Sequence, residues 1–138
     1  MSSPFSLAVT GLFSLATFFS ETLLRPPVQF HDAFEGEFDG LPEPVQDALL
    51  AHAGLLEQFG PVLGRPRVDT LKGSRHANMK ELRFDADGGV WRFAFAFDPN
   101  REAIVLVGGD KSGTGEKRFY RQLIRKTDER FDRHLSRL

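Results

Sequence analysis

The sequence contains no cysteine, which excludes disulfide bonds and thiolate metal sites. Its four histidines have neither the HExxH spacing nor another common ligand spacing, so we expect no metal and no cofactor. The longest apolar run, from Leu7 to Phe19, is shorter than the roughly 20 residues that span a bilayer. We therefore expect a cytoplasmic protein with no membrane partner.

Lysine and arginine are absent from residues 28–62, which carry seven acidic residues, although the net charge of the whole chain is only −1. Residues 65–83 and 111–138 are basic instead. Such a polarised charge distribution favours binding of a polyanion at the basic side. The alternative is that these charges solvate helix faces and pair with one another.

The length of 138 residues predicts one domain, and 41% hydrophobic residues with 14 phenylalanines are enough for a core. The regular apolar pattern begins only after Arg25, so we assign residues 27–138 to the domain and residues 1–26 to an N-terminal appendage. The appendage is a weak membrane or export segment, an extra helix, or the product of a start codon upstream of the usual one. The late start of the pattern favours the last interpretation.

Two helices are predicted after a short strand at 28–30. In the first helix Phe34 and Phe38 lie four residues apart, with Asp32 as the expected N-cap and Gly40 as the stop. The second helix ends at Gly60 and has apolar residues at helical spacing, namely Val45, Leu49, Ala53, Leu56 and Phe59. Together they form an acidic helical hairpin.

Three strands are predicted next, at 79–84, 90–97 and 103–109, separated by the turn sequences DADGG and DPNRE. A final helix begins near Gly115 and carries an apolar stripe of Phe119, Leu123, Ile124, Phe131 and Leu135. The predicted order is β-α-α-β-β-β-α. This order indicates an α+β domain with helices packed on a curved antiparallel sheet.

An arginine interrupts the regular alternation of the stretch VWRFAFAF, residues 90–97. The aromatic residues fall on one face, and Arg92 shares the other face with small residues. Arg92 is therefore expected to stand above a shallow alanine surface, where an anion reaches it from solvent. The alternative is a salt bridge to a neighbouring strand.

The glycine-rich stretch GGDKSGTGEK lies between the last strand and the last helix, where a phosphate-binding P-loop would lie. Asp110 precedes Lys111 and Glu116 precedes Lys117, so neither lysine has the Gly-Lys-Ser/Thr context that a P-loop needs. Nucleotide hydrolysis is not expected.

The stretches LKGSRHANMKELRF, VWRFAFAFDPNREAIVLVGGDKSG and KRFYRQLIRKTDERFDRHL resemble the RelE/ParE superfamily of bacterial type II toxin–antitoxin toxins. The resemblance is to its HigB-like, phage-derived branch and covers about residues 28–138. It leaves residues 1–26 unmatched. The superfamily has the β-α-α-β-β-β-α order that the periodicity predicts.

The resemblance implies a metal-independent, ribosome-dependent mRNA endoribonuclease, an mRNA interferase that inhibits translation. Its implied partners are the ribosome, mRNA and a cognate helix-turn-helix antitoxin. In this reaction the 2′-OH of one nucleotide attacks the adjacent phosphate, so the protein must stabilise a pentacovalent phosphate and move two protons.

Four residues are the catalytic candidates that the resemblance implies. Arg92 and Lys111 match basic positions of the superfamily at the middle strand and at the end of the last strand. Lys80 and Arg83 alternate to opposite faces of one strand, so at most one of them shares the face of Arg92, and the pattern of the superfamily favours Arg83. Tyr120 is either a catalytic phenol or half of a buried aromatic pair with Phe119.

Further residues are candidates for binding RNA, namely Lys72, Arg75, His76, Lys80 and Lys117. His134 is either a proton-transfer group or a packed or capping histidine. Glu81 departs from the pattern, since the best-studied branch carries a lysine there, so its catalytic set cannot be transferred whole.

Two other functions remain open. One is a ParE-like toxin that inhibits gyrase without nuclease activity and does not need a basic cluster around Arg92. The other is a non-toxic, phage-derived regulatory or interaction module, in which the acidic helical hairpin is the working surface.

Overall fold

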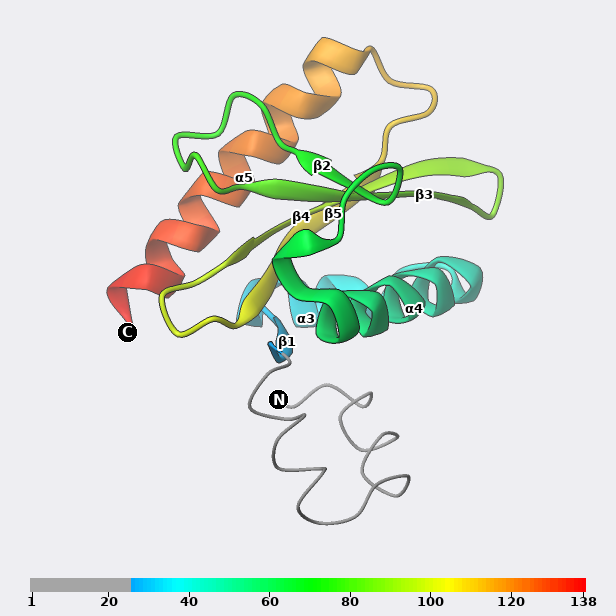
Figure 1. Cartoon of the computed structure of the whole chain (residues 1–138). Helices are drawn as coiled ribbons and strands as arrows, with labels where there is room; N and C mark the ends of the chain where they lie inside the picture. The colour runs from blue at the N-terminus through cyan, green and yellow to red at the C-terminus, as the bar shows by residue number, and fades with distance from the viewer. Residues whose placement is uncertain (1–25) are drawn as a thin grey trace, which may run out of the picture.

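A computed structural model describes residues 26–138, which form one five-stranded sheet between two layers of helix (Figure 1). Helices α3 and α4 cover one face of the sheet, and α5 crosses the other (Figure 1). Within these residues no helix combines the length and apolar character that a bilayer crossing requires. The appendage predicted at 1–26 lies, Pro26 apart, outside the described residues.

The α+β class predicted from the sequence is confirmed. The elements are β1 Val28–Phe30, α3 Asp32–Asp39, α4 Glu43–Phe59, the 3₁₀ turn η1 Gly60–Val62, β2 Val68–Thr70, β3 Lys80–Ala86, β4 Gly89–Phe97, β5 Ala103–Asp110 and α5 Glu116–Ser136. Their order in the sheet is β1-β5-β4-β3-β2. The three strands of the predicted meander are therefore its centre.

The sheet differs from the prediction in two details. β2 is an additional strand, and its three residues are too few to show an alternating pattern in sequence. β1 pairs with β5 in parallel, so the sheet is mixed rather than wholly antiparallel. Strand direction depends on the path of the chain through both helices, which local periodicity does not record.

The α3/α4 face of the sheet is the aromatic face predicted from the alternation in β4. Phe93 and Phe95 are fully buried there against Phe34 of α3 and Leu49 of α4. The N-cap of α3 is His31 rather than Asp32, because the His31 ring nitrogen Nδ1 accepts the N–H of Ala33 at 3.1 Å. This face is closed by hydrocarbon packing.

The other face of β4 is covered by α5. Ala94 and Ala96 are fully buried beneath Phe119, Leu123 and Phe131 of that helix. The expected alanine surface therefore exists, but α5 seals it from solvent. The solvent access expected for Arg92 is wrong for this reason, since 6% of that residue is exposed.

Candidate functional site

Two arginines face each other on the α5 side of the sheet. Arg83 of β3 and Arg92 of β4 are direct cross-strand partners. The two-residue turn at Asp87 and Gly88, both with positive φ, makes this a non-hydrogen-bonded pair, the kind in which side chains lie closest. Like charges in that position destabilise a sheet, so the pair needs an anionic partner.

Glu81 is the buried carboxylate beside this pair. Its Oε1 lies 3.5 Å from Nε of Arg92, and both residues are buried. Arg83 is two residues further along β3 and lies 3.5 Å from the carboxylate of Asp69 through Nη1. The salt bridge to a neighbouring strand, which the sequence left open for Arg92, is therefore present.

Both arginines nevertheless keep unused donors. Nη1 of Arg92 donates to the carbonyl of Trp91 at 2.9 Å. The Nε atoms of Arg92 and Arg83 are buried and have no hydrogen-bond partner within residues 26–138. A buried N–H donor without an acceptor costs free energy, and an incoming anion would satisfy both of these donors.

Tyr120 completes the cluster from α5. Its hydroxyl donates to Oε1 of Glu81 at 2.7 Å. Burial, followed by the hydrogen bond and charge of Glu81, raises the pKa of Tyr120 to about 12, and Arg92 opposes this shift. The phenol is protonated at neutral pH and acts as a donor. Its ring also packs edge-on against Phe119 at 5.2 Å, so both roles considered for it are compatible.

Lys111 lies at the open side of the cluster. Its Nζ is 5.9 Å from the ring centroid of Tyr120 and 3.2 Å from Oε1 of the exposed Glu116. The four predicted catalytic residues thus converge from β3, β4, the end of β5 and α5. Glu81, which the sequence marked only as a departure, is the acceptor at their centre.

The predicted RNA-binding loop is attached further along α5. The Asp132 carboxylate pairs with the guanidinium of Arg75 and accepts a hydrogen bond from the ring nitrogen Nε2 of His76 at 2.7 Å. The hydrogen bond to His76, followed by that to Arg75, lowers the pKa of Asp132. Asp128 accepts from the backbone N–H of Arg75 at 3.1 Å. Lys72 is exposed in the same loop.

The acidic anchors of this loop were not found from the sequence. Asp128 and Asp132 lie four residues apart on a mostly basic helix, and that spacing was the available signal. Their pairing with the loop depends on how the chain folds back over α5.

The remaining candidates lie outside the cluster. Lys80 pairs with Phe95 and falls on the α3/α4 face, opposite to Arg92, as the preference for Arg83 assumed. Lys117 is exposed in the first turn of α5. His134 stacks on Phe131 and bonds to the buried Asp98 at 2.8 Å, roughly 21 Å along the helix from Tyr120, so it lies far from the cluster.

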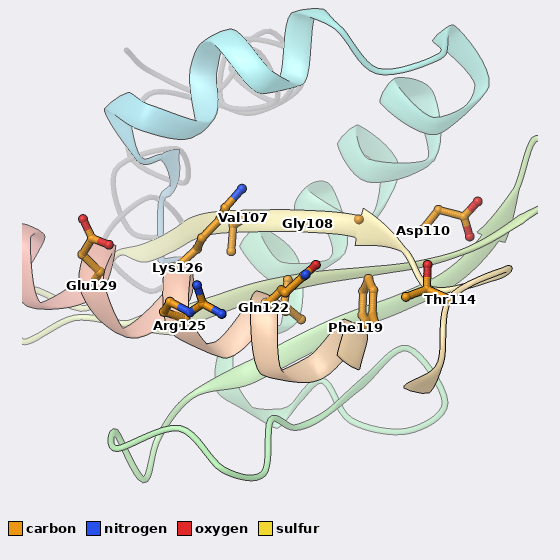
Figure 2. A pocket seen from close by; sticks show the side chains of 11 residues that line it. Val107, Gly108, Asp110, Thr114, Phe119, Gln122, Arg125, Lys126 and Glu129 are labelled. Atoms are coloured by element: carbon orange, nitrogen blue, oxygen red, sulfur yellow. The ribbon is translucent and has the colours of Figure 1, made fainter. Parts of the chain in front are cut away.

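An open groove of about 650 Å³ lies between β5 and α5 (Figure 2), and no residue of the cluster lines it. Its floor is the edge of β5 at residues 107–110, and α5 contributes Arg125 and Lys126. Within the described residues no group of three side chains has the composition of a metal site.

The structure thus defines a small α+β protein with the RelE-like architecture and a cationic cluster beneath its C-terminal helix. Residues 36–132 match the family described as "Phage derived protein Gp49-like (DUF891)". The chain belongs to this family, which is the family of HigB-like toxins.

Two relatives come from Mycobacterium tuberculosis (strain ATCC 25618 / H37Rv). The chain is 44% identical over 99 residues to "Putative toxin HigB2", covering 71% of this chain and 49% of that protein. It is 47% identical over 94 residues to "Putative toxin HigB3", covering 66% of this chain and 80% of that protein. The chain thus spans about half the length of the first relative and four fifths of the second. No solved structure matches.

Proposed function

We propose that this chain is the toxin of a type II toxin–antitoxin pair and a ribosome-dependent endoribonuclease that cuts mRNA without a metal. The family and the names of two relatives support the toxin role. The nuclease role rests on the cationic cluster. Its partners are then the ribosome, mRNA and an antitoxin, expected to be a small helix-turn-helix protein.

The cross-strand arginine pair is the observation that carries the nuclease proposal. Arg83 and Arg92 hold two positive charges side by side, their buried Nε atoms make no hydrogen bond within residues 26–138, and Lys111 adds a third positive charge nearby. A phosphate that becomes pentacovalent gains negative charge, which two guanidinium groups stabilise in a site of low dielectric. A hydrophobic pair at these positions would serve stability better.

The cluster also contains a donor and an acceptor for the two proton transfers. In this reaction the O2′–P bond forms, the P–O5′ bond breaks, and the products are a 2′,3′-cyclic phosphate and a free 5′-OH. Tyr120, protonated because its pKa is about 12, donates the proton that O5′ takes up. The Glu81 carboxylate, which accepts from Tyr120 in the free protein, accepts the 2′-OH proton.

A ligand reaches the cluster from the side on which its residues are exposed to solvent. About a third of the Arg83 side chain and a fifth of the Lys111 side chain are exposed, whereas that of Arg92 is 8% exposed. A phosphate would meet Arg83 and Lys111 first and would reach Arg92 when the hydrogen bond between Tyr120 and Glu81 opens.

The test is cleavage of a defined mRNA by the purified full chain in the presence of translating ribosomes. Arg83→Gln should reduce cleavage by about a hundredfold, the typical cost of losing one transition-state donor. Arg118→Gln, an exposed arginine on α5 outside the cluster, is the matched control and should cleave normally. New ends should carry a 5′-OH, which polynucleotide kinase labels without prior dephosphorylation.

Two results would contradict the nuclease proposal. One is intact mRNA under conditions in which the chain arrests growth, which would favour a gyrase inhibitor. The other is equal cleavage by Arg83→Gln and the Arg118→Gln control, which would separate the cluster from the reaction.

A further inference from the structure

A third arginine lies beside the cross-strand pair on the same face of the sheet. The backbone N–H of Arg83 donates to the carbonyl of Arg67 at 2.8 Å, so the pairing of β2 with β3 extends one residue beyond Val68. Val68 is buried with the core under α3 and α4, and its neighbour Arg67 therefore points to the opposite face. Arg67, Arg83 and Arg92 form an arginine row across three strands, about 10 Å from the first Cα atom to the last.

Exposure to solvent increases along the arginine row. The side chain of Arg92 is 8% exposed, that of Arg83 is 33% exposed, and Arg67 is fully on the surface. Beyond Arg92 the row ends at Gly109 of β5, where an added Cβ would lie 3.2 Å from the ring of Phe119. At its other end lies β2, an edge strand of the sheet (Figure 1). A chain of phosphates bound in the cluster therefore continues along the row toward Arg67.

The guanidinium of Arg67 is available to such a ligand, in contrast to that of Arg65. Arg65 bonds to Oδ2 of Asp69 through Nε at 3.1 Å and through Nη2 at 2.9 Å. The other oxygen of Asp69 accepts the backbone N–H of Thr70 at 2.8 Å. The side chain of Arg67 makes no hydrogen bond or ion pair within residues 26–138. An exposed guanidinium that the adjacent salt bridge leaves out can bind an external anion.

Acidic side chains lie on both sides of the arginine row. Asp69 and Glu81 are opposite each other on β2 and β3, next to the row on one side. Asp85 is exposed two residues beyond Arg83 on the same face of β3, next to the row on the other side. These carboxylates repel a polyanion that crosses the sheet along another line. The arginine row is therefore the most favourable path for a polyanion on this part of the face.

We propose that Arg67 is a second phosphate-binding site, which holds the phosphate next to the one bound by Arg83 and Arg92 in a single-stranded RNA. This assignment rests on the proposed nuclease function and adds the direction of the RNA, which leaves the cluster across the β2 edge. Because the phosphate at Arg67 does not react, Arg67 stabilises the bound RNA equally before and during cleavage.

An acidic peptide is the other anionic ligand that the arginine row could bind. Only every second side chain of an extended peptide faces the row, whereas every phosphate of an RNA strand lies in its backbone. Neighbouring guanidinium groups therefore fit consecutive phosphates better than they fit consecutive carboxylates.

The first test measures binding of two short oligonucleotides to the full chain by NMR. A 2′-O-methyl uridine dinucleotide without terminal phosphates has one phosphate, the corresponding trinucleotide has two, and neither can be cleaved. Arg67→Gln should weaken trinucleotide binding by about fivefold and change dinucleotide binding by less than about twofold. Arg67→Lys keeps the charge and should bind the trinucleotide within about twofold of the unaltered chain.

The Nε–H signals of the arginine side chains report the contacts directly. The Arg67 signal should shift with the trinucleotide and not with the dinucleotide, whereas the Arg83 signal should shift with both. Arg67→Gln should also reduce the salt dependence of trinucleotide binding by about 0.7 in the log–log slope, the value for one phosphate contact with a single strand. Arg118→Gln is the matched control and should bind both oligonucleotides normally. Unchanged thermal unfolding midpoints would show that the variants fold.

The second test separates binding at Arg67 from the chemistry of the cluster. In cleavage of a defined mRNA on translating ribosomes, Arg67→Gln should raise KM by about fivefold and change kcat by less than about twofold. The reason is that it removes an interaction of equal strength in the bound state and in the transition state. Arg83→Gln should lower kcat instead.

Three results would overturn the proposal while the unaltered chain still cleaves mRNA. They are equal trinucleotide binding by Arg67→Gln and the Arg118→Gln control, a loss of kcat in Arg67→Gln as large as that in Arg83→Gln, and a capped triglutamate peptide that shifts the Arg67 signal at lower concentration than the trinucleotide. Failure of the proposed function gives a different result, namely no cleavage by the unaltered chain and no shift of the Arg83 signal with either oligonucleotide. That result would overturn both.

Discussion

The two faces of the central sheet are both covered by helices, yet they are built differently. Beneath α3 and α4 the buried side chains are mainly hydrocarbon, with Phe93 stacked between Phe84 and Trp91, although Glu57 of α4 is also buried. Beneath α5 the hydrocarbon layer is interrupted by the buried charges of Arg92 and Glu81. Burying charges costs free energy that apolar side chains would not. The difference teaches that one face is built mainly for stability, whereas the other gives up some stability to hold a buried cluster of charges.

The largest effect on stability is expected at the α3/α4 face. Phe93→Ala removes a fully buried ring and should lower the free energy of unfolding by about 4 kcal/mol, because the cavity cannot be filled without moving the strand. Urea denaturation of the full chain measures this loss. A loss below about 1 kcal/mol would mean that this face is not the main source of stability.

A smaller loss is expected when the buried ion pair is broken. Arg92→Met leaves Glu81 buried without its cationic neighbour and should cost about 3 kcal/mol. Adding Glu81→Leu should restore most of that stability without restoring any RNA cleavage. Denaturation and cleavage assays on the same preparations separate the two properties. A double variant that is stable and active would remove the functional distinction between the faces.

The ionisation of Tyr120 reports directly on the α5 face, because it is the only tyrosine in the chain. The folded pKa of about 12 lies above the ordinary value of 10.0, so the phenol contributes stability below pH 10 that is lost as pH rises toward 12. Absorbance at the tyrosinate wavelength should therefore titrate near pH 12 in the folded protein.

The same titration tests the role of Glu81. Glu81→Gln should lower the pKa of Tyr120 toward 10.0, although burial, the largest cause of the shift, remains. A native titration near pH 10, or one that Glu81→Gln leaves unchanged, would show that the phenol does not lie in the cluster as described.

The smallest effect is expected at the loop anchored on α5. The pKa of Asp132 lies below its ordinary value of 3.8. The attachment of the loop to Asp132 should therefore be complete above pH 3.8 and weaken as the pH falls below that value. Asp132→Asn should loosen the loop at every pH with little change in global stability. Amide exchange of residues 72–78 at pH 5 and pH 3 checks this. Equal amide exchange of these residues in the unaltered protein and in Asp132→Asn at pH 5 would contradict this prediction.

The sequence was sufficient for the features that repeat along the chain. Alternation in β4 predicted which residues line each face, and helical spacing predicted the buried apolar positions of α4. The exceptions are Phe59, which is 47% exposed at the end of that helix, and Glu57, which is buried although it is charged. Features that depend on distant segments were not predictable in the same way. The burial of Arg92 depends on α5, and the parallel pairing of β1 depends on the path of the chain through two helices.

In the candidate site too, the residues could be named from the sequence, whereas their contacts depend on distant segments. Resemblance to a family identified Arg83, Arg92, Lys111 and Tyr120, and the structure brings them together. The sequence did not reveal that Glu81 joins Arg92 to Tyr120, since the three residues lie on separate elements. Register between strands, together with the position of α5, determines that contact.

The most direct test of the functional difference between the faces is primer-extension mapping of mRNA after induced expression in a bacterial host. The full chain should produce new 5′ ends within translated reading frames. The folded Arg92→Met, Glu81→Leu variant should produce none, while Arg118→Gln should match the full chain. Growth arrest with intact mRNA, or new ends that persist in the double variant, would contradict the assignment of RNA cleavage to the α5 face.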